Sequence, residues 1–367
     1  MGGKPSAIRH DPARPGDTPP AQPQGPAPGV RAHQKGSDMT ATGGDDANAL
    51  SGPAHGPTAA VMAIRYVDTN GRVSLSTQGG ASVDTPFVLA SLGKMMTAAV
   101  VLQLVAEGAL TLDGPARQWL AGDLVQGLGG LDCITMRHLL TMRSGLPEYL
   151  NNAYVTDALG DPGRVQKAAV AVSYAYGLEP LFPPGADFHY SNTNYVLLGL
   201  ILEQVTRRSY ASVLTERLFR PLGMGASLVF GSAPLPANFP DGHHHGMLVR
   251  DCYRFPGFGD GGVIATAPDL VRFCRALLVT RDLLPAALLD QMTTAVGDIP
   301  YGMGIEVEAG VLGHSGGDLG FSSDVRVDPQ TGTVAVAFAA SADADLGWTL
   351  DAIAAAADRH RPGGTAG

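Results

Sequence analysis

The sequence predicts an α+β fold: an antiparallel sheet flanked by helices, with an all-α lobe inserted into it. Strand patterns gather near both ends of the ordered chain, whereas helical patterns and long loops dominate the middle. The chain has 367 residues, enough to bury a sizeable core. We therefore expect one domain over residues 58–360, with an α/β part at about 58–109 and 261–360 and a helical lobe at about 110–260.

The first 57 residues differ in composition from the rest. They are rich in Pro, Gly, Ala and Asp, as in "PARPGDTPPAQPQGPAPG". Such a segment buries too little apolar surface to offset chain entropy, so a disordered tail is expected over residues 1–57. No apolar segment follows the basic residues at the N-terminus, so no signal peptide and a cytoplasmic location are expected. Export stays open if the start is misassigned, because Met39 could also begin the protein.

The first ordered elements are predicted to be a hairpin and a buried helix. "AAVMAIRYV" and "GRVSLSTQ" flank "DTNG", a hairpin turn signal. A helix is then expected from Ser91 to about Glu107, ending at Gly108. It is apolar on nearly every face, which is typical of a central buried helix. Its apolar stretch, Met95 to Ala106, is too short to span a membrane.

Three helices are predicted in the helical lobe, and a helix, two strands and a final helix are predicted after it. "ITMRHLLTMRSGLPEYL" predicts a short helix ending at Ser144-Gly145, and "NTNYVLLGLILEQVTRRS" and "YASVLTERLFRPLGM" predict two more. Loops dominate residues 151–185 and 231–262, and long loops often line a cleft. "APDLVRFCRALL" is helical, "DPQTG" joins two strands, and "LGWTLDAIAAAADRH" closes the chain as a helix.

Charge and composition exclude several classes of function. The net charge of -9 does not favour a nucleic-acid or anionic-membrane partner. Three separated cysteines, Cys133, Cys252 and Cys274, predict inert thiols rather than disulfides or a zinc site. Three consecutive histidines at residues 243–245 cannot easily converge on one ion, so a solvated loop is the better interpretation and no metal is expected.

Ser91 and Lys94 form the first candidate site. At positions i and i+3 of a helix their side chains face the same way, beside free N–H groups at the helix N-terminus. Serine is a weak nucleophile that needs a base, and burial of a lysine disfavours its ammonium form. The pair could therefore act as nucleophile and base. Alone, the pattern is weak, and a capping serine with a snorkelling lysine explains it better.

Two further stretches support this site. Tyr190-Ser191-Asn192 directly precedes a predicted helix, where a phenol could pass a proton and an amide could hold a substrate carbonyl or amide group. The segment from His314 to Gly317 begins a predicted strand, whose edge N–H groups could bind an oxyanion. Taken singly, these motifs are equally explained by a capping residue and by a glycine-rich hairpin.

Together the three motifs, in this order, resemble the serine β-lactamase and penicillin-binding-protein superfamily. The resemblance covers about residues 60–358 and extends to "HLLTMRSGLPEY", "RPLGM" and "GDGGVIATAPDLVRF". It is closest to the class C branch, which includes D-alanyl-D-alanine carboxypeptidases, D-aminopeptidases and esterases. Tyr-Ser-Asn and His-Ser-Gly point to the peptidase and esterase side, and imply a β-lactamase-like fold.

The resemblance implies a role for each matched residue. Ser91 would be acylated, while Lys94 and Tyr190 would move the proton. Asn192 would contact the amide side of the substrate, and His314 would lie near the substrate carboxylate or the tyrosine. Ser315 and Gly317 would also bind substrate, with the N–H groups of Ser91 and Gly317 forming the oxyanion hole. No metal or organic cofactor is implied.

The resemblance predicts a serine hydrolase acting through an acyl-enzyme on small-molecule or short peptide substrates. D-amino-acid peptides or amides are expected, as for a D-alanyl-D-alanine carboxypeptidase. An esterase or acyltransferase of the same fold is the alternative among enzymes. A penicillin-binding sensor without turnover is the alternative outside them. No loop glutamate for deacylation can be placed, so the sequence does not support efficient β-lactamase activity and leaves open whether β-lactams are hydrolysed. An unperturbed His314 predicts activity that changes between about pH 5 and 8.

Three other residues are weaker candidates. His138 lies in the "RHLLT" helix, where a structural histidine is the better interpretation. Tyr149 could border the cleft. Asp187 follows a "PPG" turn and could belong either to that turn or to the cleft.

Overall fold

A computed structural model describes residues 62–129, 131–165, 167–244 and 247–360. The tail predicted at residues 1–57 lies outside the described residues. The expected division of the remainder into an α/β part and a helical lobe stays a prediction.

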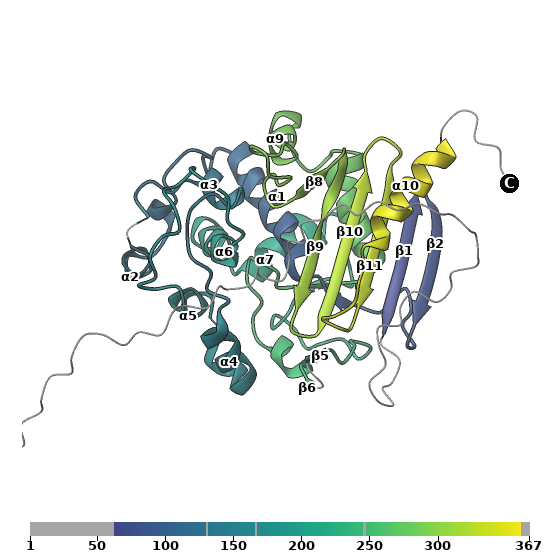
Figure 1. Cartoon of the computed structure of the whole chain (residues 1–367), viewed down its shortest axis with the longest axis horizontal. Coiled ribbons are helices and arrows are strands. Elements are labelled where there is room, and N and C mark those ends of the chain that lie inside the picture. The colour runs from purple at the N-terminus through teal and green to yellow at the C-terminus, as the bar shows by residue number, and fades with distance from the viewer. Residues whose placement is uncertain (1–61, 130, 166, 245–246, 361–367) are drawn as a thin grey trace, which may run out of the picture. The chain divides into compact units, whose positions relative to one another are not determined.

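A six-stranded antiparallel sheet combines strands from both ends of the described chain (Figure 1). Its order is β2-β1-β11-β10-β9-β8. The register places Ala63 opposite Ala339, so the first strand pairs with the last. The strands are β1 (Ala63–Thr69), β2 (Arg72–Gln78), β8 (Glu306–Glu308), β9 (Val311–Asp318), β10 (Phe321–Asp328) and β11 (Thr333–Ala339). The predicted α+β class with an antiparallel sheet is confirmed.

Both predicted hairpin turns are present. Asn70 and Gly71 connect β1 to β2 with φ angles of 48° and 87°. Positive φ at both central positions is the geometry of a type I′ turn, which explains why "DTNG" forms a tight hairpin. The Asp68 carboxylate accepts the Gly71 N–H at 2.7 Å. In the β10–β11 turn, Asp328 accepts the Gln330 N–H at 2.8 Å.

Alternation along β11 directs side chains to two different layers. Val336 and Phe338 belong to the main core, and Phe338 stacks on Phe87 with ring centroids 5.3 Å apart. Ala337 and Ala339 face the other way and pack with Leu346 and Trp348 near the C-terminal helix. Both faces of the strand are therefore buried, which accounts for its unbroken apolar sequence.

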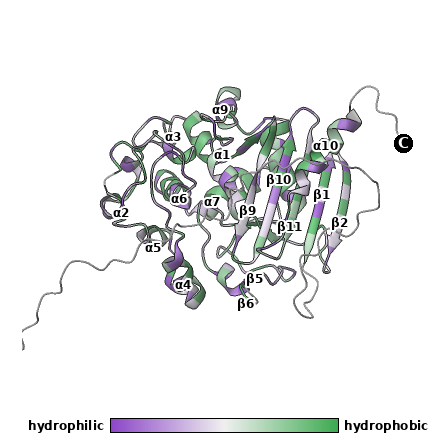
Figure 2. Cartoon of the chain, in the orientation of Figure 1, coloured by the Kyte–Doolittle hydropathy of each residue, from purple (hydrophilic) through white to green (hydrophobic). Residues whose placement is uncertain are grey.

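All the α-helices of the described residues except α10 lie between β2 and β8 in the chain. α1 is largely hydrophobic (Figure 2) and most of its residues are buried, so the predicted central helix is confirmed. The helices are α1 (Gly93–Ala106), α2 (Gly122–Gly127), α3 (Met136–Leu140), α4 (Asn152–Gly160), α5 (Ala168–Ser173), α6 (Asn192–Thr206), α7 (Tyr210–Leu214), α8 (Ala267–Cys274), α9 (Ala286–Met292) and α10 (Trp348–His360).

Two expectations about the middle of the chain were wrong in detail. The helix expected to end at Ser144-Gly145 ends at Leu140, because Met142 adopts a left-handed φ of 58°. Strand β4 lies within the lobe expected to be helical and joins a three-stranded sheet of order β3-β7-β4. Its strands are β3 (Phe87–Val88), β4 (Leu228–Val229) and β7 (Val263–Ala265), and a separate pair is β5 (His243–His244) and β6 (Met247–Leu248).

The described residues include no helix long and apolar enough to cross a membrane. Within the same ranges, no group of three or more His, Cys, Asp or Glu side chains is placed to hold a metal ion. All three cysteines are free thiols: Cys133 is exposed, Cys252 is partly buried and Cys274 is buried.

Candidate active site

Ser91 lies on a constrained turn between β3 and α1. One 3₁₀ turn, Ala90–Leu92, precedes the α-helix, so the helix proper begins at Gly93 rather than at Ser91 as expected. The cause is Ala90, whose φ of 48° is left-handed. Such a conformation costs roughly 1–3 kcal/mol for a residue with a side chain and is found most often at functional sites.

The large and small sheets hold this turn from two directions. The Leu89 N–H donates to the Val263 carbonyl at 2.8 Å, and the Leu89 carbonyl accepts the Ser323 hydroxyl at 2.6 Å. Glycine allows the close approach: a Cβ at Gly316 would lie 2.4 Å from Ser323 Oγ and 2.8 Å from the Leu89 carbonyl oxygen. β9 can therefore lie against the turn only because Gly316 has no side chain.

Lys94 lies one turn after Ser91 and is completely buried. Its Nζ donates to Ser91 Oγ at 2.9 Å and to the Asp260 carbonyl oxygen at 2.6 Å. Burial lowers the pKa of Lys94 from 10.5 to about 8, and the nearby carboxylates of Asp260 and Glu148 oppose that shift. A fraction of about a tenth is then neutral at pH 7 and can accept a proton. The predicted pairing of Ser91 with Lys94 is present in the structure.

Asp260 supports Lys94 from the glycine-rich segment before β7. Its carboxylate accepts the Tyr149 hydroxyl at 2.7 Å, while its carbonyl accepts Lys94. Burial raises the pKa of Asp260, and Lys94 opposes that rise. Tyr149 is 4% exposed and holds the Asp260 carboxylate in place, and its suggested place at the edge of a cleft stays a prediction. The sequence analysis did not select Asp260, because its carbonyl, not its side chain, meets the lysine.

Tyr190 lies on the other side of Lys94. The Lys94 Nζ is 5.1 Å from the centroid of the Tyr190 ring. The Tyr190 hydroxyl is buried and makes no hydrogen bond within the described part of the chain. Burial raises the pKa of Tyr190 well above 10, and the adjacent Ser91 hydroxyl opposes this rise. The structure therefore places this phenol beside Ser91 and Lys94, as predicted.

Asn192 begins α6 and is held by a glutamate that the sequence analysis missed. Its backbone N–H and its Nδ2 both donate to Glu148 Oε2, at 2.8 and 2.9 Å. Burial raises the pKa of Glu148. The carboxylate therefore caps the helix and fixes the amide, and the predicted contact of Asn192 with substrate stays a prediction. The position of Glu148 in "SGLPEY", a loop next to a predicted motif, was the available signal.

His314 is buried on β9, and its two ring nitrogens meet Ser315 and Tyr301. Its Nδ1 lies 2.6 Å from the Ser315 carbonyl, and its Nε2 lies 3.1 Å from the Tyr301 hydroxyl. A carbonyl only accepts, so Nδ1 carries the proton and Nε2 accepts from Tyr301. Burial lowers the pKa of His314 to about 4, against the pull of Glu306. The pH window expected from an unperturbed histidine is therefore corrected to lower pH.

Ser315 and Gly317 lie further along the same strand. The Ser315 N–H and hydroxyl both donate to Glu306 Oε1, at 3.0 and 2.8 Å. Gly317 is exposed, and no atom lies within 4 Å of the point where a side chain would begin there. Of these two residues predicted to bind substrate, Gly317 is exposed to solvent, whereas the N–H and hydroxyl of Ser315 are already bonded to Glu306.

The weaker candidates have structural roles. His138 accepts the Thr135 N–H through Nδ1 in a capping box at the start of α3. Asp187 is exposed and accepts the N–H of Phe188, as a turn residue does. The third histidine of the run at 243–245 lies outside the described residues.

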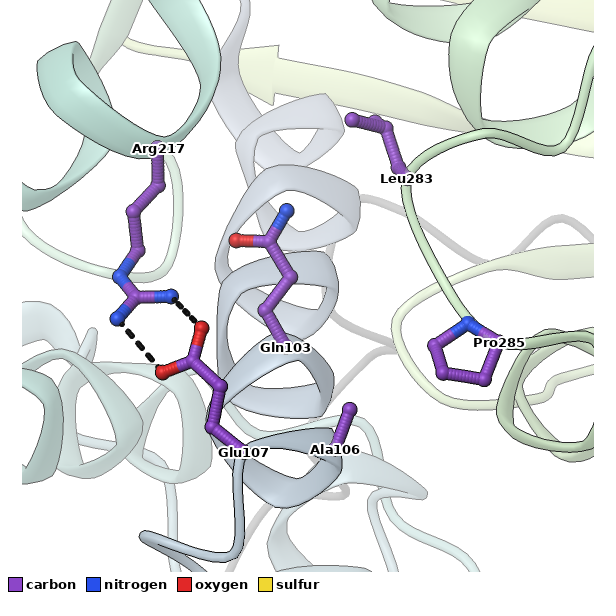
Figure 3. A pocket seen from close by; sticks show the side chains of 6 residues that line it. All are labelled: Gln103, Ala106, Glu107, Arg217, Leu283 and Pro285. Atoms are coloured by element: carbon purple, nitrogen blue, oxygen red, sulfur yellow. Dashed lines mark hydrogen bonds and ion pairs between the residues drawn. The ribbon is translucent and has the colours of Figure 1, made fainter.

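A surface hollow of about 430 Å³ lies at the other end of α1 (Figure 3). The ion pair between Arg217 and Glu107 lies along it, with N–O distances of 2.7 and 2.9 Å. Ser91 precedes the first turn of α1 and Glu107 follows its last, so the two are about 20 Å apart. This hollow is therefore separate from the candidate active site.

Comparisons with known proteins agree with this architecture. A family model described as Beta-lactamase matches residues 48–358. Penicillin-binding protein 4* of Bacillus subtilis (strain 168) is 29% identical over 288 residues, which are 71% of this chain and 62% of that relative. The chain thus spans less than two thirds of the length of this curated relative.

Solved structures add two amide-cleaving enzymes. A D-stereospecific amidohydrolase from Streptomyces sp. superimposes with a TM-score of 0.70 at 30% identity, covering 79% of this chain and 93% of that one. D-amino acid amidase from Ochrobactrum anthropi SV3, complexed with L-phenylalanine amide, gives 0.66 at 25% identity, covering 82% and 92%. The fold is β-lactamase-like, as the motifs implied. The chain belongs to the Beta-lactamase family, whose members are serine hydrolases.

Proposed function

We propose that this protein hydrolyses D-amino-acid amides or short peptides through an acyl-enzyme formed on Ser91. The observation that carries the proposal is the 2.9 Å hydrogen bond between Lys94 Nζ and Ser91 Oγ, made by a lysine that is wholly buried. A base of lowered pKa within hydrogen-bonding distance is what an unactivated serine requires.

The proposed acylation is a proton transfer coupled to carbonyl addition. Neutral Lys94 takes the hydroxyl proton of Ser91 while Oγ bonds to the substrate carbonyl carbon. The N–H groups of Ser91 and Gly317 receive the developing oxyanion. Lys94 and Tyr190 then return the proton to the leaving nitrogen as the C–N bond breaks. A water molecule then gives a proton to the same base while its oxygen bonds to the acyl carbon. The ester bond to Ser91 breaks, Ser91 regains its proton, and the acid is released.

The substrate class is supported by the solved neighbours. The Streptomyces and Ochrobactrum structures carry the names of a D-stereospecific amidohydrolase and a D-amino acid amidase. An esterase or acyltransferase would use the same three residues. A carboxypeptidase would use them on substrates ending in a free carboxylate.

The test is an intact-protein mass time course with D-alaninamide and with benzylpenicillin. Wild-type protein and Ser173→Ala, whose exposed hydroxyl lies far from the motifs in sequence, should release D-alanine from the amide. Ser91→Ala should release none and should gain no adduct.

Three other outcomes would redirect or end the proposal. Full activity in Ser91→Ala would refute the assignment of the nucleophile. A lasting penicillin adduct without any turnover of amides would favour the sensor. Product that forms only when an amine or alcohol acceptor is added would favour an acyltransferase.

A further inference from the structure

The edge of β9 beside the candidate nucleophile has a short open segment. β8 pairs with β9 only as far as Gly313, which is opposite Glu306. Beyond that point no strand of the described residues pairs with the outer edge of β9. The Ser315 N–H points to this edge, because it meets Glu306, and the Gly317 N–H two residues on points the same way. Substrate groups next to the scissile bond must lie along these donors if Gly317 binds the oxyanion.

Glu306 already fills the first part of that edge. Its Oε1 accepts both the N–H and the hydroxyl of Ser315, at 3.0 and 2.8 Å. The same oxygen lies 3.5 Å from His314 Nδ1. A carboxylate of the protein therefore occupies the donors that a substrate carboxylate would need. The Glu306 side chain remains 23% exposed, so its charge is not sealed from an incoming ligand.

The charges around Glu306 do not turn this edge positive. Arg326 Nη1 lies 2.7 Å from Glu306 Oε2, but Asp324 binds the same guanidinium at 2.9 and 3.0 Å. Two carboxylates share one cation, which leaves a net charge of -1. Burial lowers the pKa of His314, which favours the neutral imidazole at neutral pH.

Three further carboxylates near the site add negative charge. Asp260, Glu148 and Asp318 all act on Lys94 as negative charges, and Asp318 ends β9 one residue after Gly317. An anionic substrate end would meet repulsion from these groups and from Glu306, and would find the Ser315 donors occupied. An uncharged end meets neither penalty.

We infer that Glu306 is a specificity residue that excludes substrates with a free carboxylate beside the scissile bond and leaves amidated or esterified ones as the substrate class. This inference rests on the proposed function, since it assumes acyl transfer at Ser91. The inference favours an amidase over a carboxypeptidase, a choice that the motifs alone left open.

The experiment compares two peptides that differ only in this charge. Cleavage of the peptide bond gives two molecules of D-alanine from D-alanyl-D-alanine and one from its N-methylamide, so the D-alanine that mass spectrometry quantifies is halved for the free acid before the rates are compared. Wild-type kcat/KM should favour the N-methylamide by at least about tenfold, the effect of one unscreened charge at short range. Glu306→Gln keeps an acceptor for Ser315 but no charge, and should reduce the ratio to below about threefold.

Two variants separate charge from disturbance of the strand. Glu308→Gln removes an exposed carboxylate from the same strand and should keep the wild-type ratio. Ser315→Ala removes one donor but leaves the Glu306 charge, and should also keep the preference for the N-methylamide.

Each remaining outcome has a defined meaning. A wild-type ratio near one, or a preference for the free acid, overturns the inference even if Glu306→Gln fails to fold. An unchanged ratio in folded Glu306→Gln, or loss of the preference in Ser315→Ala, also overturns it. Absence of both D-alanine release and acyl-enzyme from either peptide contradicts the proposed function instead, and the inference falls with it.

Discussion

The proposed role of Lys94 as a base predicts that its buried amine favours activity and opposes stability. The chain keeps a cationic group inside the core, with one serine hydroxyl and one carbonyl as hydrogen-bond acceptors. A lysine whose pKa falls on folding destabilises the folded state at every pH below that lowered value. For a fall from 10.5 to about 8, the cost is about 3 kcal/mol. A residue retained at that cost is expected to be needed for function.

Replacement of Lys94 by methionine should therefore abolish activity and raise stability. Acylation should slow by about 10²–10⁴-fold, because the general base is gone. The free energy of unfolding at pH 7 should rise by about 1–3 kcal/mol, since the desolvated charge is removed while two hydrogen bonds are lost. Rates of adduct formation and urea unfolding measure the two effects. Lys167→Met, at an exposed position, should change neither.

The pH profile of acylation should report Lys94 and not His314. kcat/KM should rise with pH through about 8, because only the neutral amine accepts the serine proton. His314 stays neutral from pH 5 to 8, so no separate transition is expected there. A stopped-flow profile from pH 5 to 10 measures this. An inflection near pH 6.5 that vanishes in His314→Gln would show that the histidine titrates in the mechanism.

Sequence reasoning selected side chains that the structure brings together but missed the groups that contact them. The i, i+3 spacing predicted that Ser91 and Lys94 face the same way, and Lys94 Nζ lies 2.9 Å from Ser91 Oγ. Asp260 escaped notice because it acts through its carbonyl, which every residue possesses. Glu306 escaped because its contact with Ser315 depends on the register of a three-residue edge strand. No local pattern encodes that register.

At the level of elements, the position of the nucleophile depends on how closely β9 approaches the turn before α1. Ser323 on β10 donates to the Leu89 carbonyl, and Gly316 lies between them without a side chain. The small sheet closes the other side through Val263. Its strands are two and three residues long, too short to show alternation, so the sequence could not predict it.

Alanine at Gly316 should push β9 away from this turn. Its Cβ would overlap Ser323 Oγ and the Leu89 carbonyl, and overpacking of this kind costs about 1–3 kcal/mol. Activity should fall by about 10²-fold or more, because a shift of 1 Å between nucleophile and oxyanion donors suffices for that loss. Thermal unfolding and kcat/KM measure both. Gly225→Ala, which meets no atom within 4 Å, is the matched control, and equal behaviour of the two variants would contradict the argument.

At the scale of the whole described chain, two ion pairs and a hydrogen bond connect the candidate site to the C-terminal helix. Glu306 on β8 pairs with Arg326 on β10, and Arg326 pairs with Asp324 on the same strand. Asp324 Oδ1 accepts the hydroxyl of Thr349 in α10 at 2.6 Å. The edge strand, the centre of the sheet and the last helix thus share one buried network.

The order of strands and helices could be predicted from the chain, but this network could not. Turn signals and apolar periods are local, and they placed β1, β2, β10, β11 and the long helices. Arg326 and Asp324 lie two residues apart within a buried strand, where alternation predicts only that both face the same way. Their partners Glu306 and Thr349 come from other elements, and the pairing appears only once the sheet is assembled.

Replacement of Arg326 by methionine should destabilise the protein more than loss of any surface ion pair. Glu306 and Asp324 would be left without their shared cation, and breaking a buried pair in this way costs about 3–5 kcal/mol. The unpaired carboxyls would then titrate at higher pH in the folded state, so the loss should shrink as pH falls from 7 to 5. Urea unfolding at both pH values measures this. Arg254→Met breaks an exposed pair with Asp251 and should cost at most about 1 kcal/mol at either pH. A pH-independent loss in Arg326→Met would mean that packing, not charge, holds the network together.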